Sequence, residues 1–147
     1  MIADFALATF MVAITVTTHF IGLLGLMWAL RRSGHRFHAH ESWTGQGAAI
    51  MVVVLGLVGI HTIEIWSYSV VYLVIGALPD FEAALYFSTT SFTTLGYGDL
   101  VLDHRWRLFG AIEGANGLLL FGWSTAFLFS VTSRMRMLEH DWLEPRL

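Results

Sequence analysis

The stretch Thr-Thr-Leu-Gly-Tyr-Gly-Asp at residues 93–99 decides how this chain is interpreted. Its glycines, Gly96 and Gly98, alternate with residues that carry side chains. Glycine enters the left-handed backbone region at little cost, so such alternation lets successive carbonyl groups turn toward the same side of the chain. The stretch therefore predicts an irregular, glycine-containing loop.

The chain on either side of this loop is too apolar for an ordinary soluble domain, since 56% of its 147 residues are hydrophobic and 13% are charged. A helix that crosses a membrane needs about 20 apolar residues to span about 30 Å of hydrocarbon. Segments 5–30, 48–77 and 108–131 meet this requirement. The sequence predicts an all-α membrane protein with three transmembrane helices.

Between the second and third spans, segment 81–92 is apolar but long enough for only about half a bilayer. Pro79 is expected to end the preceding helix, and Asp80 to cap the new one, with Glu82 favoured in its first turn by the helix dipole. Irregular backbone at membrane depth is tolerated only inside protein or along an aqueous path. We therefore expect a re-entrant helix that leads into the loop.

Residues 94–98, Thr-Leu-Gly-Tyr-Gly, closely resemble the selectivity filter of potassium channels, in which four such loops replace the hydration shell of an ion with rings of backbone carbonyls. The resemblance extends over the pore helix, the filter, Asp99 and the inner helix. It implies that K⁺ is the permeant ligand and that no other cofactor is needed. The filter residues that it implies are Thr94, Leu95, Gly96, Tyr97 and Gly98, with K⁺ held by oxygens of the first four.

Around the filter the sequence departs from the family pattern. Leu95 replaces the commoner valine or isoleucine, and Tyr86-Phe87 stands where many relatives carry two tryptophans. Thr90 stands where some relatives carry a glutamate, so it cannot form their carboxyl pairing with Asp99. How the filter is braced is left open. The residues expected to support it are Asp99, Tyr86, Phe87, Thr90 and Glu113, the last through hydroxyl groups at positions 89–91.

The third span aligns Gly117 with the hinge position of the family, although its glycines at 110, 114, 117 and 122 could serve helix packing alone. Helical periodicity places Phe121, Thr125 and Phe129 on one stripe, with Leu118 and Gly122 nearby. By resemblance this stripe lines the cavity. Phe129, near the cytoplasmic end, is the candidate gate, because an apolar ring can stop ions by dewetting; the alternative is that it only packs against neighbouring helices.

Ionisable side chains inside the spans are functional hypotheses by default. His19 lies near the middle of the first span, and His61 and Glu64 lie one helical turn apart in the second. His19 can therefore bond across to either one and fix how the first helix docks. A structural hydrogen bond is favoured over a proton sensor.

Three histidines, His35, His38 and His40, follow the first span at a spacing that suits metal binding or a response to pH. Cysteine is absent, and Glu41 is the carboxylate that joins them. A solvated loop is therefore the favoured interpretation.

Arginine positions predict the orientation. They gather after the first span and after the third, at Arg31, Arg32, Arg36, Arg134, Arg136 and Arg146, against Arg105 and Arg107 between the second and third spans. By the positive-inside rule the first loop and the C-terminus are cytoplasmic, and the N-terminus is outside. We expect a multi-pass protein of the cell membrane, similar to small prokaryotic channels of the inner membrane with an additional N-terminal helix.

One copy of the loop supplies one wall of a pore, and the sequence has no internal repeat, so a four-fold symmetric tetramer is expected. We expect an N-terminal transmembrane helix and cytoplasmic loop at 1–45, a potassium-channel pore module at 46–135 and a short cytoplasmic tail at 136–147. The expected partners are K⁺, membrane lipid and further copies of the chain, with no nucleic acid. Gating then resides in the pore module, in the first helix or in an unidentified regulatory partner.

The resemblance implies a subunit that conducts K⁺ passively. Enzymatic function is not expected, because the sequence offers no paired carboxylates, nucleophile-base set or phosphate loop in a water-accessible context. One alternative is the pore subunit of a potassium-uptake system controlled by a separate partner, although such proteins usually carry four unequal loops in one chain. The others are a weakly selective cation channel and a membrane scaffold whose glycines serve only helix packing.

Overall fold

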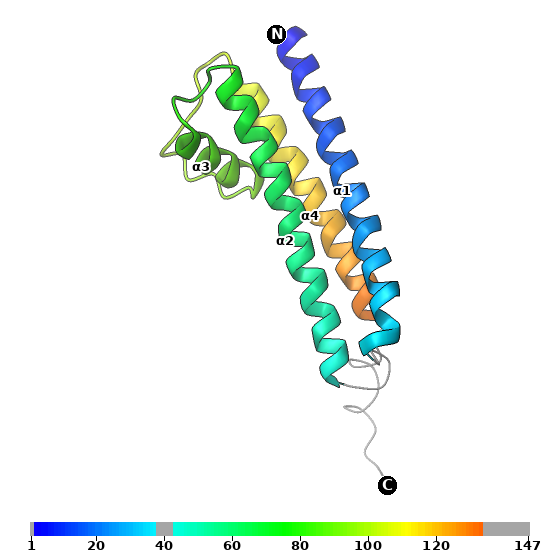
Figure 1. Ribbon diagram of the computed structural model, residues 1–147. Helices are drawn as coiled ribbons and strands as arrows, with labels where there is room; N and C mark the ends of the chain where they lie inside the picture. Colours follow the sequence, from blue (N-terminus) through cyan, green and yellow to red (C-terminus); the bar gives the residue numbers. More distant parts are fainter. Residues whose placement is uncertain (1, 38–42, 134–147) are drawn as a thin grey trace.

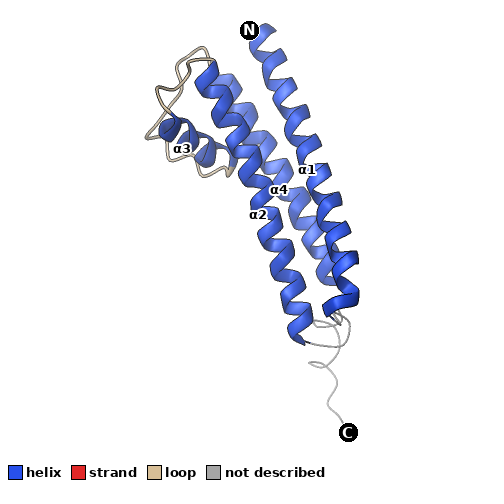
Figure 2. Ribbon diagram, in the orientation of Figure 1, coloured by secondary structure: helices blue, strands red, loops and turns tan. Residues whose placement is uncertain are grey.

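The computed structural model describes residues 2–37 and 43–133, with the side chains of residues 4–32 and 44–133. Its helices are α1 (Ile2–Phe37), α2 (Trp43–Val74), α3 (Phe81–Phe92) and α4 (Arg107–Ser133), and the described part of the chain holds no strand. The long helices α1, α2 and α4 run side by side, while the short α3 packs near one end of the bundle (Figures 1 and 2). The predicted all-helical fold is confirmed.

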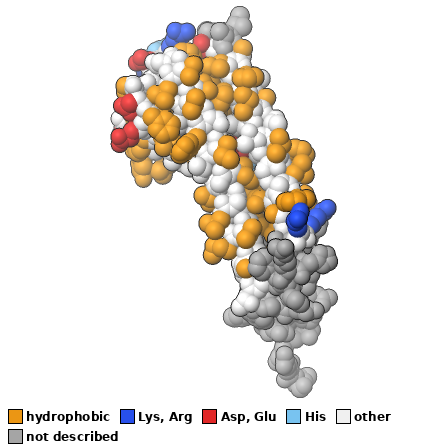
Figure 3. All heavy atoms as spheres, viewed as in Figure 1, with side chains coloured by type: hydrophobic (Ala, Val, Ile, Leu, Met, Phe, Trp, Pro, Cys, Tyr) orange, Lys and Arg blue, Asp and Glu red, His pale blue; other side chains and the backbone are white. Residues whose placement is uncertain are grey.

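Three of these helices are long and apolar enough to cross a membrane, at Asp4–Arg32, Thr44–Val74 and Arg107–Ser133. Apolar side chains cover the bundle along its length in the face shown in Figure 3, and charged ones gather near its ends. A surface of this kind suits lipid rather than water. The three predicted spans are confirmed, and the chain is a multi-pass membrane protein.

The end of α2 differs from the prediction. The helix ends at Val74, and Gly76 follows in the left-handed region with φ 65°. The N–H of Ala77 donates to the carbonyl of Tyr72 at 2.9 Å, which is the bond of a Schellman motif. The prediction that Pro79 ends the helix is therefore wrong, because the glycine has already turned the chain.

The start of α3 agrees with the prediction. Asp80 is the N-cap, and its carboxylate accepts a hydrogen bond from the N–H of Ala83 at 2.9 Å. Glu82 lies in the first turn, where the positive end of the helix dipole favours it. These local signals fix where α3 begins.

The helices are joined by a core that all four of them share. Its buried residues include Met11 of α1, Tyr68 of α2, Phe92 of α3 and Phe109 of α4. Glycine also brings α1 against α2, because a Cβ at Gly22 would lie 2.6 Å from the Ile60 side chain. The short helix α3 is thus held between α2 and α4, with α1 on the other side of the bundle (Figure 1).

Several predictions fall at the edge of the described chain. Backbone at His35 belongs to α1, so the first helix continues beyond the expected residue 30. Other predictions concern residues outside the described part of the chain, namely His38, His40, Glu41, Arg134 and the tail at 136–147 with Arg136 and Arg146.

Candidate functional site

The loop after α3 has an alternating backbone. Thr94, Gly96 and Gly98 have φ of 61°, 53° and 77°, and the other described residue with a positive φ is Gly76. Left-handed residues at every second position turn successive carbonyls toward one side. Thr94 is a non-glycine residue in this region, which is uncommon and is typical of functional segments.

Hydrogen bonds from the end of α3 hold this backbone in place. The N–H of Thr94 donates to the Ser91 carbonyl at 3.0 Å, and the N–H of Gly96 donates to the Thr90 carbonyl at 2.9 Å. The loop therefore starts directly at the carbonyl end of α3. That end carries the negative pole of the helix dipole, which favours a cation nearby.

The outward side of the loop is open in a single chain. Leu95 and Tyr97 are 55% and 67% exposed. A Cβ at Gly96 or Gly98 would meet no atom within 4 Å. Glycine is needed at these two positions because of the backbone angle, not because space is lacking.

Tyr86 ties α3 to the end of the loop. Its hydroxyl donates to Asp99 Oδ2 at 2.6 Å, while Asp99 Oδ1 accepts from the N–H of Leu100 at 3.0 Å. The Tyr86 hydrogen bond holds the pKa of Asp99 below its usual range, and the same bond raises the pKa of Tyr86. Thr90 does not take part, since its hydroxyl donates to the Phe87 carbonyl at 3.0 Å. The sequence did not reveal which residue holds Asp99, and in the structure the Tyr86 hydroxyl does so.

Glu113 connects three helices from the inside. Its carboxylate is fully buried and accepts one bond from the Tyr72 hydroxyl and one from the Ser88 hydroxyl, each at 2.5 Å. The prediction that hydroxyls at 89–91 would be its partners is not what the structure shows. Thr89 and Thr90 donate to carbonyls of their own helix, and Ser88 faces Glu113. One residue along a helix rotates a side chain by about 100°, so a small error in register selects a different partner.

A second polar contact lies next along α4. The amide nitrogen of Asn116 donates to the hydroxyls of Thr15 and Tyr68, at 2.7 and 3.2 Å. All three side chains are buried, and they come from α1, α2 and α4. Asn116 was not singled out from the sequence, although an amide inside a predicted span is a usable signal.

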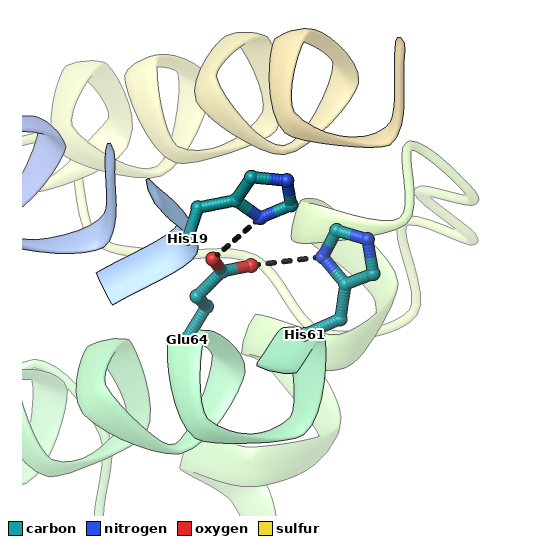
Figure 4. A group of neighbouring side chains, drawn as sticks. All are labelled: His19, His61 and Glu64. Atoms are coloured by element: carbon teal, nitrogen blue, oxygen red, sulfur yellow. Dashed lines mark hydrogen bonds and ion pairs between the residues drawn. The ribbon is translucent and has the colours of Figure 1, made fainter. Parts of the chain in front are cut away.

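His19, His61 and Glu64 form a compact buried group (Figure 4). His19 Nδ1 lies 3.0 Å from Glu64 Oε1, and His61 Nδ1 lies 2.8 Å from Oε2. Ser124 of α4 lies on the other side of both rings, with its Oγ 2.9 Å from His61 Nε2 and 3.4 Å from His19 Nε2. The contact joins α1, α2 and α4. Sequence reasoning brought the first three residues together and missed Ser124, because serine in a span carries no distinct signal.

Glycines on α4 allow α3 and its loop to approach closely. A Cβ at Gly117 would clash with the backbone carbonyl of Phe92, and a Cβ at Gly114 would lie 3.2 Å from the Ser91 carbonyl. At Gly110 it would lie 3.0 Å from Leu102. Gly122 meets nothing within 4 Å, so packing does not explain that glycine in a single chain. A hinge at Gly117 stays a prediction.

Residues 47–134, which include α3, α4 and nearly all of α2, match a family model described as ion channel. The chain belongs to this ion channel family. No curated protein and no solved structure gives a significant match. A member of such a family conducts ions passively through a membrane and is not an enzyme.

The residues predicted to line a cavity differ in their exposure on α4. Leu118, Thr125 and Phe129 are exposed, Leu118 and Phe129 to 62% and 72%. Phe121 is only half-buried and stacks on the His61 ring, with centroids 4.2 Å apart. Leu119 is 72% exposed as well, so exposure in a single chain does not single out one stripe, and the cavity lining stays a prediction.

Proposed function

We propose that this ion channel is selective for potassium and that residues 94–98 form its selectivity filter. The observation that carries the proposal is the left-handed backbone at Thr94, Gly96 and Gly98, alternating with Leu95 and Tyr97 in the filter-like sequence. Such alternation supports an arrangement in which the carbonyl oxygens line one side of the loop. Rings of these oxygens replace the hydration shell of K⁺. The Thr94 hydroxyl would add the innermost ring.

A single chain supplies one wall of this pore, so the proposal includes a tetramer with four-fold symmetry. The exposed surfaces support it. Leu95 and Tyr97 of the loop, and Leu118 and Phe129 of α4, are large apolar side chains that are more than half exposed in one copy. Neighbouring copies around a central axis would cover the loop side chains. Pore-facing positions of α4 would then line the cavity.

The orientation proposal places α3 as a re-entrant helix on the outer side. The N-terminus and α3 lie near the same end of the bundle, and α1 runs from there to the other end (Figure 1). Arg31 and Arg32 belong to the last part of α1. By the positive-inside rule the arginine end is cytoplasmic. The membrane proposed is a prokaryotic inner membrane, because the chain resembles small prokaryotic channels.

A weakly selective cation channel is the second candidate. The observation in its favour is the altered brace, in which Tyr86 rather than a carboxyl group at position 90 holds Asp99. The buried hydrogen bonds that Glu113 accepts from Tyr72 and Ser88 favour a potassium-selective channel, because they fix α3 against α2 and α4. A rigid α3 would keep the loop oxygens in place without the carboxyl pair.

Potassium flux into liposomes that contain the purified protein tests the filter assignment. Gly98→Ala places a Cβ on a left-handed residue, where it costs about 1–2 kcal/mol in each copy, and should abolish selective flux. Gly25→Ala is the matched control, because that glycine is in α1 and meets nothing within 4 Å. Both variants should insert and assemble as the wild type does. Full potassium selectivity in Gly98→Ala would contradict the assignment.

A further inference from the structure

The buried group at the junction of α1 with the rest of the channel has the make-up of a metal site. His19, His61 and Glu64 each offer a ligand atom, and these atoms lie within 4.8 Å of one another. The side chains of His19 and Glu64 are fully buried, and His61 is 6% exposed. We propose that these three residues bind one divalent transition metal ion, of which zinc is the model, and that the ion fixes α1 onto α2 and α4.

Charge is the first reason. Glu64 lies inside a membrane span, and both of its oxygens face imidazole nitrogens, at 3.0 and 2.8 Å. A buried carboxylate is costly unless a positive charge or several donors compensate it. Within the described chain, both ion pairs of Glu64 are to histidines, which carry charge only when protonated. A divalent cation supplies the compensating charge and binds neutral imidazole.

The donor set selects the class of ion. Two imidazole nitrogens and one carboxylate suit Zn²⁺ and its first-row neighbours, whereas Mg²⁺ and Ca²⁺ prefer oxygen ligands throughout. Tetrahedral bonds of about 2.0–2.2 Å from one ion place adjacent ligand atoms about 3.3–3.6 Å apart. The nitrogen-oxygen separations of 2.8 and 3.0 Å are slightly shorter than that spacing, and all the ligand atoms lie within 4.8 Å of one another, so the side chains would adjust to seat an ion.

The surroundings provide the second layer that metal-bound histidines usually have. Each ring turns its Nε2 toward Ser124 Oγ, at 2.9 Å from His61 and 3.4 Å from His19. A histidine that binds metal through one nitrogen commonly donates the N–H of the other to an oxygen, which fixes the tautomer. Phe121 stacks on His61, and the Trp123 ring lies 5.3 Å from that of His19. These aromatic rings therefore flank the two histidines.

The site would make docking of α1 depend on metal. α1 contributes His19, α2 contributes His61 and Glu64, and α4 contributes Ser124. The competing description is a metal-free ring of hydrogen bonds among the same residues, in which protons supply the positive charge. The two descriptions differ in one measurable quantity, which is the metal bound per chain.

Metal content of the full-length purified protein separates them. The protein is stripped with a chelator, mixed with ZnCl₂ and desalted, and zinc is then measured by mass spectrometry. The background carries alanine in place of His35, His38 and His40, which follow the first predicted span in the sequence. We expect one zinc per chain, with none in His19→Gln or Glu64→Gln. His104→Ala is the matched control, because that histidine is exposed and distant in sequence, and it should keep the zinc.

Two further measurements test the same site. Ser124→Ala retains all three ligands and should weaken zinc binding by about 10-fold or more, as loss of an outer partner usually does. In the same His35, His38 and His40 alanine background, CoCl₂ should give a visible spectrum that Glu64→Gln or a chelator removes. Absence of bound metal, or equal zinc in the background protein and in Glu64→Gln, would overturn the proposal in favour of the hydrogen-bonded ring. Neither measurement depends on ion flux, so its failure leaves the selectivity proposal standing.

Discussion

Two carboxylates lie buried inside the spans of this channel, and their partners differ. Glu113 accepts from the hydroxyls of Tyr72 and Ser88, whereas Glu64 meets the imidazoles of His19 and His61. Hydroxyl groups stabilise a carboxylate without bringing the charge or the transition-metal affinity of an imidazole. Imidazoles can bring both. The region around α3 is therefore braced by fixed neutral donors, and the junction with α1 is built from groups that bind cations.

The braced region should be most sensitive where α4 touches α3. Gly117→Ala would place a methyl group against the Phe92 backbone carbonyl, so α3 must move away or the helices must separate. We expect loss of the folded channel in gel filtration and in thermal unfolding. Gly122→Ala is the matched control on the same helix, because its Cβ meets nothing within 4 Å. Equal stability of the two variants would mean that close packing at Gly117 is not required.

Removing Glu113 should have the next largest effect. Glu113→Ala leaves the buried hydroxyl of Tyr72 without its acceptor, at about 1–3 kcal/mol for the unsatisfied group, while the Ser88 hydroxyl keeps the Ile65 carbonyl at 2.9 Å. Denaturant unfolding should show this loss of stability. Ser88→Ala removes one donor and should cost less. Glu82→Ala, at an exposed position, serves as the control, and a loss in that variant as large as in Glu113→Ala would contradict the bracing role.

The Tyr86 brace predicts a dependence on pH. Its bond lowers the pKa of Asp99 from 3.8, so it stabilises the loop above that pH and the stabilisation is lost as pH falls through the lowered value. Tyr86→Phe removes the donor. As the pH is lowered, the loop should lose its structure at a higher pH in this variant than in the wild type. Potassium flux into liposomes, measured over a range of acidic pH, monitors this loss. If the flux of the variant and of the wild type falls at the same acidic pH, the Tyr86 bond does not support the loop.

Phe129 should give the smallest structural effect. It is 72% exposed near the end of α4, so Phe129→Ala removes an apolar ring without opening a cavity in one chain. If four copies close the pore there, resting flux should rise while the preference for potassium is unchanged. Liposome flux without any stimulus measures this. Unchanged resting flux in an assembled variant would move the gate elsewhere, to the filter first of all.

Local signals in the sequence predicted more than contacts between distant residues. Apolar length predicted the three spans, and Asp80 predicted the start of α3, because each signal lies within the segment that it determines. Pro79 was the wrong end for α2, since Gly76 acts earlier in the chain. The partners of Glu113 depend on how α3 is rotated about its axis, which apolar length does not reveal.

The polar groups of the candidate sites also depend on how the helices are rotated and packed, which local signals in the sequence did not predict. His19 and Glu64 could be paired from their depth in neighbouring spans. Ser124 could not, because its position depends on how α4 packs against both other helices. Tyr86 was expected to support the loop, but its bond to Asp99 required the path of the intervening chain. The depth of a residue in the membrane can be predicted from the sequence. The neighbour that its side chain meets depends on how the helices are rotated against one another, which the sequence did not reveal here.

The central claim is that the 93–99 loop selects potassium, and the reversal potential tests it most directly. The purified protein is reconstituted in a planar bilayer with a potassium salt on one side and the matching sodium salt on the other. The proposal predicts a reversal potential close to that of a membrane permeable to potassium alone, because rings of carbonyl oxygens replace the hydration shell of K⁺. A reversal potential near zero, meaning equal permeability to the two ions, would contradict it.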